Sequence, residues 1–126
     1  MNNQREIKFR VWSKNEERMI PWEKIENGSE NTLKENFDAM EKIGFILMQF
    51  TGLKDKKGVE IFEGDIVEFE TLDSINNKKL KGNVYYETIG FKVMVKDLGC
   101  KEFYGDYTEV IGDIYSNPEL KVAEDN

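Results

Sequence analysis

The stretch TGLKDKKGVEIFEGDIVEF, residues 51–69, contains two predicted turns between short apolar segments. The first is the polar segment DKKG, residues 55–58, which fits a type I turn that ends with a glycine in the left-handed conformation. The second is Gly64-Asp65, where an aspartate typically accepts a hydrogen bond from a nearby backbone amide. The stretch therefore predicts a β-hairpin that is followed directly by a third strand.

Segments before this stretch carry similar strand signals. Residues 7–12 alternate apolar and polar side chains, which predicts a half-buried strand. A short return strand is predicted at residues 18–20, and Pro21 ends it because proline donates no hydrogen bond to a ladder. Residues 45–50 form a nearly continuous apolar run, which is typical of a buried strand.

Segments after it complete the pattern. Residues 82–88 and 91–96 predict a second hairpin, residues 98–100 a turn, and residues 110–115 a last strand. Short, closely spaced strands with glycine turns favour a mainly β fold, either a barrel or two packed sheets. Gly64-Asp65-Ile66 has an echo at Gly112-Asp113-Ile114, which shared turn chemistry explains better than an internal repeat.

One short helix is predicted, over about residues 33–42. Thr32 followed by Glu35 resembles a capping box at its start, in which each residue satisfies a free amide of the first turn. Apolar residues then recur at helical spacing, and Gly44 is placed to end the helix. Local periodicity alone supports this prediction.

The composition fits one intracellular domain. The chain has 126 residues with 18 basic and 25 acidic side chains, for a net charge of −7. Such a charge disfavours binding to nucleic acid or anionic membranes unless a local basic patch overrides it. The single cysteine, Cys100, excludes an internal disulfide and fits a reducing compartment. No segment resembles a signal peptide or a membrane span, so we expect a soluble cytoplasmic protein.

No residue pattern predicts catalysis, and we expect no catalytic, cofactor-binding or metal-binding residues. The chain has no histidine and one cysteine, which excludes zinc ligation and a Ser-His or Cys-His dyad within one subunit. The acidic residues Glu63, Asp65, Glu68 and Glu70 are best explained by a turn and by solvent-facing strand positions. On this phase Val67 and Phe69 face the core, whereas Ile66 shares the outer face with Glu68 and Glu70.

Three segments of the chain resemble the YopX-like proteins, a family of small proteins typical of phages and prophages. They are LMQFTGLKDKKGVEIFEGDIVEF, IKFRVWSKNEERM near the N-terminus and EVIGDIYSNPEL near the C-terminus. The resemblance implies one domain over residues 1–126 with a barrel or sandwich of complex topology. The segment at about residues 22–43 does not match the family pattern and is treated as variable, and we expect a frayed tail at 123–126. The resemblance also implies homo-oligomers and phage origin, and it brings no catalytic residue. A phage protein is expected in the cytoplasm of a bacterial host, and the sequence predicts no cofactor.

Two tryptophans are candidates for a protein–protein contact. On the predicted strand phase, Trp12 faces away from Val11, and a tryptophan exposed on a sheet is costly in water unless a helix or another subunit covers it. If the phase slips at the turn, Trp12 is simply buried. If Trp12 is exposed, Trp12 and Trp22 together lead to the first hypothesis. The protein is then a non-enzymatic phage accessory protein that self-associates and binds a host or phage protein.

The alternative hypothesis is a small barrel that binds nucleic acid in phage replication or regulation. It rests on lysines in two predicted loops, which would form a basic patch if the loops converge: Lys54, Lys56, Lys57, Lys78, Lys79 and Lys81. Nearby aromatic residues such as Tyr85, Tyr86 and Phe91 could stack on single-stranded bases. The overall acidic charge makes this hypothesis weaker than the first.

Overall fold

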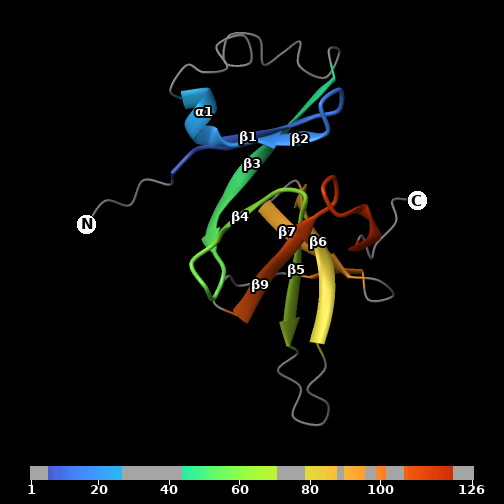
Figure 1. Ribbon diagram of the computed structural model, residues 1–126. Coiled ribbons are helices and arrows are strands. Elements are labelled where there is room, and N and C mark those ends of the chain that lie inside the picture. Colours follow the sequence, from blue (N-terminus) through green and yellow to red (C-terminus); the bar gives the residue numbers. More distant parts are fainter. Residues whose placement is uncertain are drawn as a thin grey trace. The chain divides into compact units, whose positions relative to one another are not determined.

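The computed structural model of the chain shows a mainly β protein with antiparallel strands in two sheets and a short α-helix (Figure 1). The structure describes residues 6–26, 44–70, 79–87, 90–95, 99–101 and 107–120. Contacts divide the chain into two compact units, residues 1–50 and 51–126, and each is described by itself. The helix predicted at residues 33–42 lies outside the described residues.

The first unit is built around β1 (Phe9–Ser13). This strand pairs antiparallel on one side with β2 (Arg18–Ile20) and on the other with β3 (Phe45–Lys54), whose first half belongs to this unit. The predicted strands at residues 18–20 and 45–50 are thus confirmed, and β3 extends four residues beyond the prediction. The helix α1 (Trp22–Glu26) follows Pro21 and covers one face of β1 and β2 (Figure 1).

The core of the first unit lies between α1 and this face of the sheet. Val11 and Ile20 are register partners on β1 and β2, and both are buried with Ile25 of the helix. Phe45 and Leu47 of β3 pack against this cluster. Because side chains alternate along β1, Trp12 lies on the opposite face, as the strand phase predicted.

The second unit contains the signature stretch. Its elements are the end of β3, β4 (Glu60–Phe62), β5 (Asp65–Glu70), β6 (Lys79–Glu87), β7 (Gly90–Val95), β8 (Gly99–Lys101), β9 (Thr108–Asp113) and the 3-10 helix η4 (Pro118–Leu120). Five strands form a sheet in the order β8-β7-β6-β5-β9, whereas β4 is hydrogen-bonded to β3. The predicted turn at residues 55–58 connects β3 to β4, and β6 and β7 pair antiparallel as the second predicted hairpin requires.

The core of the second unit lies on one face of the five-stranded sheet. Five buried side chains form it, with Phe69, Leu80 and Val110 packed at its margin: Ile61, Val67, Val84, Val93 and Val95. Gly82 of β6 lies at the centre of this face, directly opposite Val95 of β7. A Cβ at residue 82 would come within 2.2 Å of Val93 Cγ1 and 2.7 Å of the Met94 carbonyl oxygen, so only glycine fits.

Three sequence predictions need correction. Cys100, predicted in a turn, lies in strand β8 opposite Met94, because pairing with β7 extends the chain there. The last strand ends at Asp113, two residues earlier than predicted. Ile66, predicted to face outward, is fully buried, whereas Glu68 and Glu70 on the same face of β5 become progressively more exposed toward the end of the strand. The helix α1 was not among the predicted elements, and it lies at the start of the segment at about residues 22–43 that is treated as variable.

Candidate functional site

The turn at residues 55–58 is organised by the carboxylate of Asp55. Its Oδ1 accepts hydrogen bonds from the backbone N–H of Lys57 at 2.8 Å and of Val59 at 2.9 Å. The Gly58 N–H donates to the Asp55 carbonyl at 3.0 Å, and Gly58 has a φ of 85°. The predicted type I turn with a left-handed glycine is therefore confirmed.

The same carboxylate also holds a strand that is distant in sequence. Asp55 Oδ2 accepts a hydrogen bond of 2.9 Å from the backbone N–H of Val110 on β9. Beside it, the Lys56 N–H donates to the carbonyl oxygen of Thr108 at 3.0 Å. The Lys57 ammonium lies 3.1 Å from Glu109 Oε2. The turn is thus fastened along the edge of β9 by backbone and side-chain contacts.

Burial and hydrogen bonding act in opposite directions on Asp55. The residue is 5% exposed, and burial alone would raise the pKa of its carboxyl because it disfavours the charged form. The backbone N–H groups of Val110, Val59 and Lys57, with the Lys57 charge, outweigh this effect and hold the pKa of Asp55 below its ordinary value. The carboxylate is therefore ionised at neutral pH and serves as a backbone acceptor.

Two further aspartates of the family-like segments also bind backbone amides. Asp65, which is 2% exposed, accepts a hydrogen bond of 2.7 Å from the Phe62 N–H. Asp113 Oδ1 accepts from the N–H groups of Tyr115 at 2.9 Å and Ser116 at 2.7 Å. Within the described ranges, no three histidine, cysteine or acidic residues are grouped so that they could hold a metal ion.

Lysines from two parts of the chain approach neighbouring acidic residues on the second unit. Lys56 Nζ and Lys57 Nζ lie 3.8 Å and 3.1 Å from Glu109 of β9, and Lys79 Nζ lies 3.8 Å from Glu68 of β5. Glu68 and Glu109 are register partners across these two strands. The two lysine groups therefore flank a central pair of carboxylates instead of forming one uninterrupted basic patch.

The remaining lysines of the alternative hypothesis add little to this arrangement. Lys54 at the end of β3 and Lys81 on β6 are exposed, and Lys81 is the register partner of Glu68. Lys78 lies outside the described residues. The acidic partners on β5 and β9 reduce the positive potential that a nucleic-acid backbone would meet at this surface.

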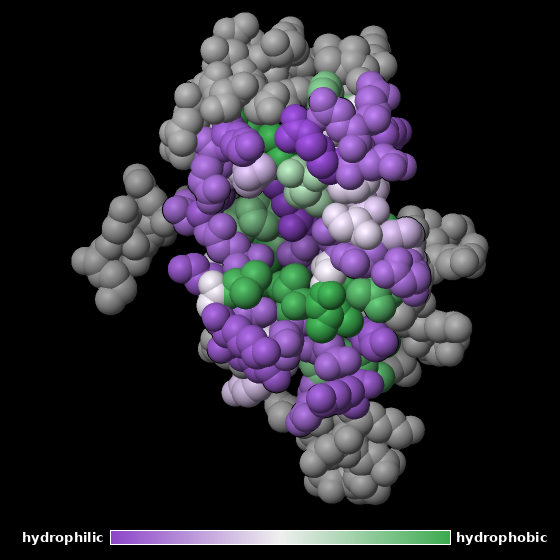
Figure 2. Space-filling model, viewed as in Figure 1, coloured by the Kyte–Doolittle hydropathy of each residue, from purple (hydrophilic) through white to green (hydrophobic). Residues whose placement is uncertain are grey.

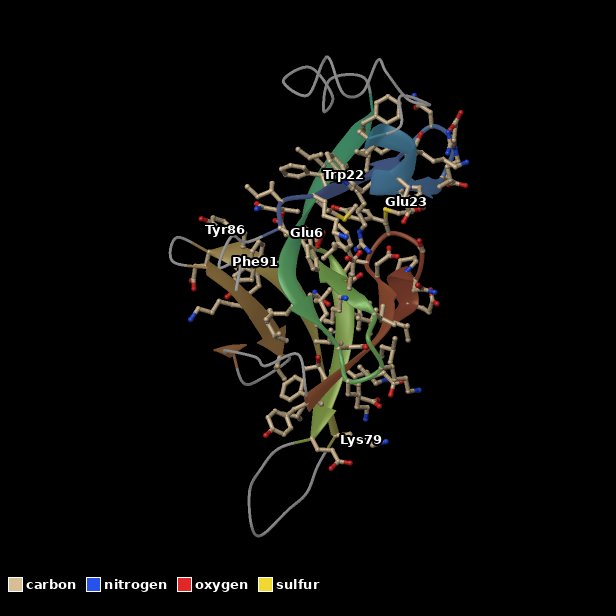
Figure 3. All side chains as sticks on the ribbon, turned by 90° about the vertical axis from the view of Figure 1, so that its left-hand side faces the viewer. Glu6, Trp22, Glu23, Lys79, Tyr86 and Phe91 are labelled. Atoms are coloured by element: carbon tan, nitrogen blue, oxygen red, sulfur yellow. The ribbon has the colours of Figure 1, made fainter. Side chains whose placement is uncertain are left out.

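The aromatic residues of β6 and β7 lie apart from these lysines. Tyr86 is 56% exposed and packs edge-on against its register partner Phe91, with ring centroids 5.2 Å apart. Figure 3 shows this pair side by side at one end of β6, while Lys79 lies at the other end. Aromatic and basic groups are therefore not interleaved as in surfaces that bind single-stranded nucleic acid.

The two tryptophans lie on different sides of the first sheet. Trp22 of α1 packs against the core around Val11, and its ring centroid is 6.1 Å from that of Phe9. Trp12 lies on the opposite face of β1, where its register partners are Met19 on β2 and Ile46 on β3. Trp12, Met19 and Ile46, which we call the Trp12 row, are each partly exposed.

Sequence reasoning identified Trp12 but missed the other two members of the row. Met19 belongs to a strand of three residues, which is too short to show a period of two. Ile46 belongs to a continuous apolar run, in which every residue has the same character and no face is distinguished. Only the register of β1 with β2 and β3 brings them to Trp12.

Comparison with known proteins gives a family and a related fold. The model of the family described as YopX protein matches residues 8–120. The crystal structure of protein EF1440 from Enterococcus faecalis is similar to this chain, with a TM-score of 0.62 and 25% sequence identity, and the match covers 93% of this chain and 99% of that one. Among curated proteins, no relative matches the chain. In the part of the chain that the structure describes, no helix is long and apolar enough to cross a membrane.

Proposed function

The chain belongs to the YopX protein family, and from this premise we propose that it is a phage accessory protein that binds other proteins and catalyses no reaction. Its place of action is the cytoplasm of the bacterial host. The protein self-associates, and the Trp12 row contributes to the contact between copies. This proposal follows the resemblance of the chain to phage and prophage proteins and one observation on the first unit.

That observation is the position of the Trp12 row. A tryptophan, a methionine and an isoleucine adjoin one another across three strands, on the face opposite α1. Tryptophan and methionine are enriched at protein interfaces, where burial of their large apolar surfaces contributes much of the binding energy. A cross-strand row of this kind is therefore better suited to a protein surface than to a nucleic acid.

Two basic side chains lie beside the Trp12 row. Lys8, directly before β1, and Arg10 within it alternate with Trp12, so an extended backbone projects them on the same face. Arg10 Nη2 lies 3.8 Å from Met48 Sδ, and Lys8 Nζ lies 5.2 Å from the centroid of the Phe50 ring. Lys8 Nζ also lies 3.5 Å from Glu6 Oε1, so both cations have partners within their own chain. Because two copies that each carry a net charge of −7 repel each other, the apolar side chains of the Trp12 row would supply the attraction between copies.

The mass of the protein in solution at micromolar concentration tests self-association. We expect the wild type to exceed the monomer mass and Trp12→Ala to move toward the monomer. Tyr86→Ala is the matched control, since it removes an exposed aromatic ring from the second unit. A strictly monomeric wild type would contradict self-association, and equal masses for wild type and Trp12→Ala would contradict the role of the Trp12 row.

A mobility-shift titration with single- and double-stranded DNA and RNA at low salt tests the alternative function. Electrostatic attraction to phosphates is strongest at low salt, so binding should be detectable there if it exists. We expect none for the wild type, because Lys56 and Lys57 pair with Glu109 and Lys79 pairs with Glu68. Tight binding that the double variant Lys56→Ala/Lys57→Ala weakens would favour the nucleic-acid function instead.

A further inference from the structure

We propose that the turn at residues 55–58 is an edge cap on β9 that prevents this strand from pairing with β9 of a second copy. The covered edge of β9 is thus a latent interface between copies, distinct from the Trp12 row. The inference does not depend on the proposed function, because it concerns a change in association relative to the wild type.

The position of β9 creates the need for such a cap. Among the strands that the structure describes, β9 is the last of the five-stranded sheet, and its one strand partner is β5. The backbone groups on the other side of an edge strand are a template for pairing with another chain. In an antiparallel strand, the N–H and C=O that point toward one side belong to every second residue.

The turn occupies two such backbone groups. The Thr108 carbonyl accepts from the Lys56 N–H, and the Val110 N–H donates to the Asp55 carboxylate. Thr108 and Val110 are two residues apart, which is the spacing of outward-pointing groups on one edge. The Lys56 N–H therefore takes the position of an amide of a paired strand, and the Asp55 carboxylate takes the position of a carbonyl group.

Two other features support a protective role. The register of β9 against β5 shifts so that Val110 faces Val67 and Gly112 faces Ile66, which leaves Ile111 as the extra residue of a β-bulge. Bulges are a common means of making an edge strand unsuitable for pairing. The Lys57 ion pair with Glu109 adds charge at the same edge, and lysine is the residue most often used there.

The surface around β9 shows why an uncovered edge would associate. Figure 2 shows hydrophobic side chains gathered in a band over the region where β9 lies in Figure 1. Val59, directly after the turn, is 48% exposed. A second copy of the chain presents the same strand. Two β9 strands, one from each copy, can therefore pair antiparallel about a two-fold axis, and no different partner protein is needed.

The substitution Lys56→Pro tests the cap while leaving its carboxylate in place. Lys56 is the second residue of the type I turn, a position at which proline is favoured, so the turn itself should persist. Proline has no N–H, and the Thr108 carbonyl then loses its donor. Lys56→Ala is the matched control, because it removes the same side chain and the ion pair but keeps the N–H.

We expect Lys56→Pro to show a concentration-dependent doubling of mass relative to wild type and to Lys56→Ala at the same concentrations. Asp55→Ala should associate as well, with faster hydrogen exchange at the Val110 amide. A spin label at Glu109→Cys in a Cys100→Ser background should report a short distance between copies in the Lys56→Pro variant. Folded Lys56→Pro and Lys56→Ala variants of equal mass would overturn the proposal, and so would association in which the labels at residue 109 lie far apart.

Discussion

Asp65 and Asp113 are register partners on β5 and β9. Each carboxylate accepts a hydrogen bond from a backbone N–H of the turn beside it. The two turns also contact each other, because the Ile114 N–H donates to the Gly64 carbonyl at 2.9 Å. The repeated Gly-Asp-Ile of the sequence therefore marks two turns at the same end of two neighbouring strands. This arrangement supports the interpretation that shared turn chemistry, and not duplication, produced the echo.

Gly58→Val should lower the free energy of unfolding by about 1–2 kcal/mol, because a branched residue disfavours positive φ. Gly58 has a φ of 85°, and a Cβ built there has no neighbour within 4 Å. The loss would therefore come from the backbone alone. Denaturant unfolding measures it, and Gly58→Asn should lose less, since asparagine tolerates the left-handed conformation. Equal stability of wild type and Gly58→Val would show that the turn does not require this conformation.

Gly82→Ala should destabilise the protein by about 1–3 kcal/mol through overpacking. The added methyl group would meet Val93 Cγ1 at 2.2 Å and a backbone oxygen at 2.7 Å, so β7 has to shift. Gly112→Ala is the comparison, because its nearest neighbour is the side-chain oxygen of Asn117, which can rotate away. Thermal and denaturant unfolding should rank Gly82→Ala below Gly112→Ala, and the reverse order would contradict the close approach at Gly82.

Asp55→Asn should destabilise the protein at neutral pH by about 1–3 kcal/mol, since an amide replaces a charged acceptor of three N–H groups. The folded pKa of Asp55 lies below its unfolded value of about 3.9. Its stabilising contribution is therefore fully present above about pH 4 and is lost as the pH falls through the folded pKa. The stability difference between wild type and variant should shrink in that acid range. A difference that stays constant to the lowest pH at which both fold would contradict the assignment.

Glu109→Gln should change stability by less than about 1 kcal/mol, although Glu109 pairs with two lysines. The lysine side chains are more than half exposed, so solvent screens the attraction. Removing the charge also relieves repulsion from Glu68 across the strands. Denaturant unfolding at low and high salt should show a small loss that disappears at high salt. A loss above 2 kcal/mol would indicate a buried role for Glu109.

Local signals were sufficient to predict the hairpins. The turn at residues 55–58 has a polar sequence that ends in glycine, and the alternation at residues 7–12 gave the correct face for Trp12. Both signals lie within a few neighbouring residues and follow from backbone geometry. The same reasoning predicted that Asp65 would bind a nearby amide, which the structure confirms.

The errors arose where distant contacts decide the structure. Cys100 pairs with Met94 in a strand of three residues, too short for any periodicity. Ile66 alternates with Glu68 and Glu70 and so resembled a solvent-facing residue, yet it is the register partner of Gly112 across a neighbouring strand and is fully buried. The contact of Asp55 with Val110 joins residues 55 positions apart, and no local pattern points to it.

That long separation has a consequence for the order of folding. A contact between distant parts of a chain forms at a large cost in loop-closure entropy, so it tends to form after the local hairpins. During synthesis, residue 110 emerges long after the turn that receives its amide. The edge of β9 is therefore not yet covered by the turn during the last stage of folding. Misassembly between nascent chains should be concentrated in that interval.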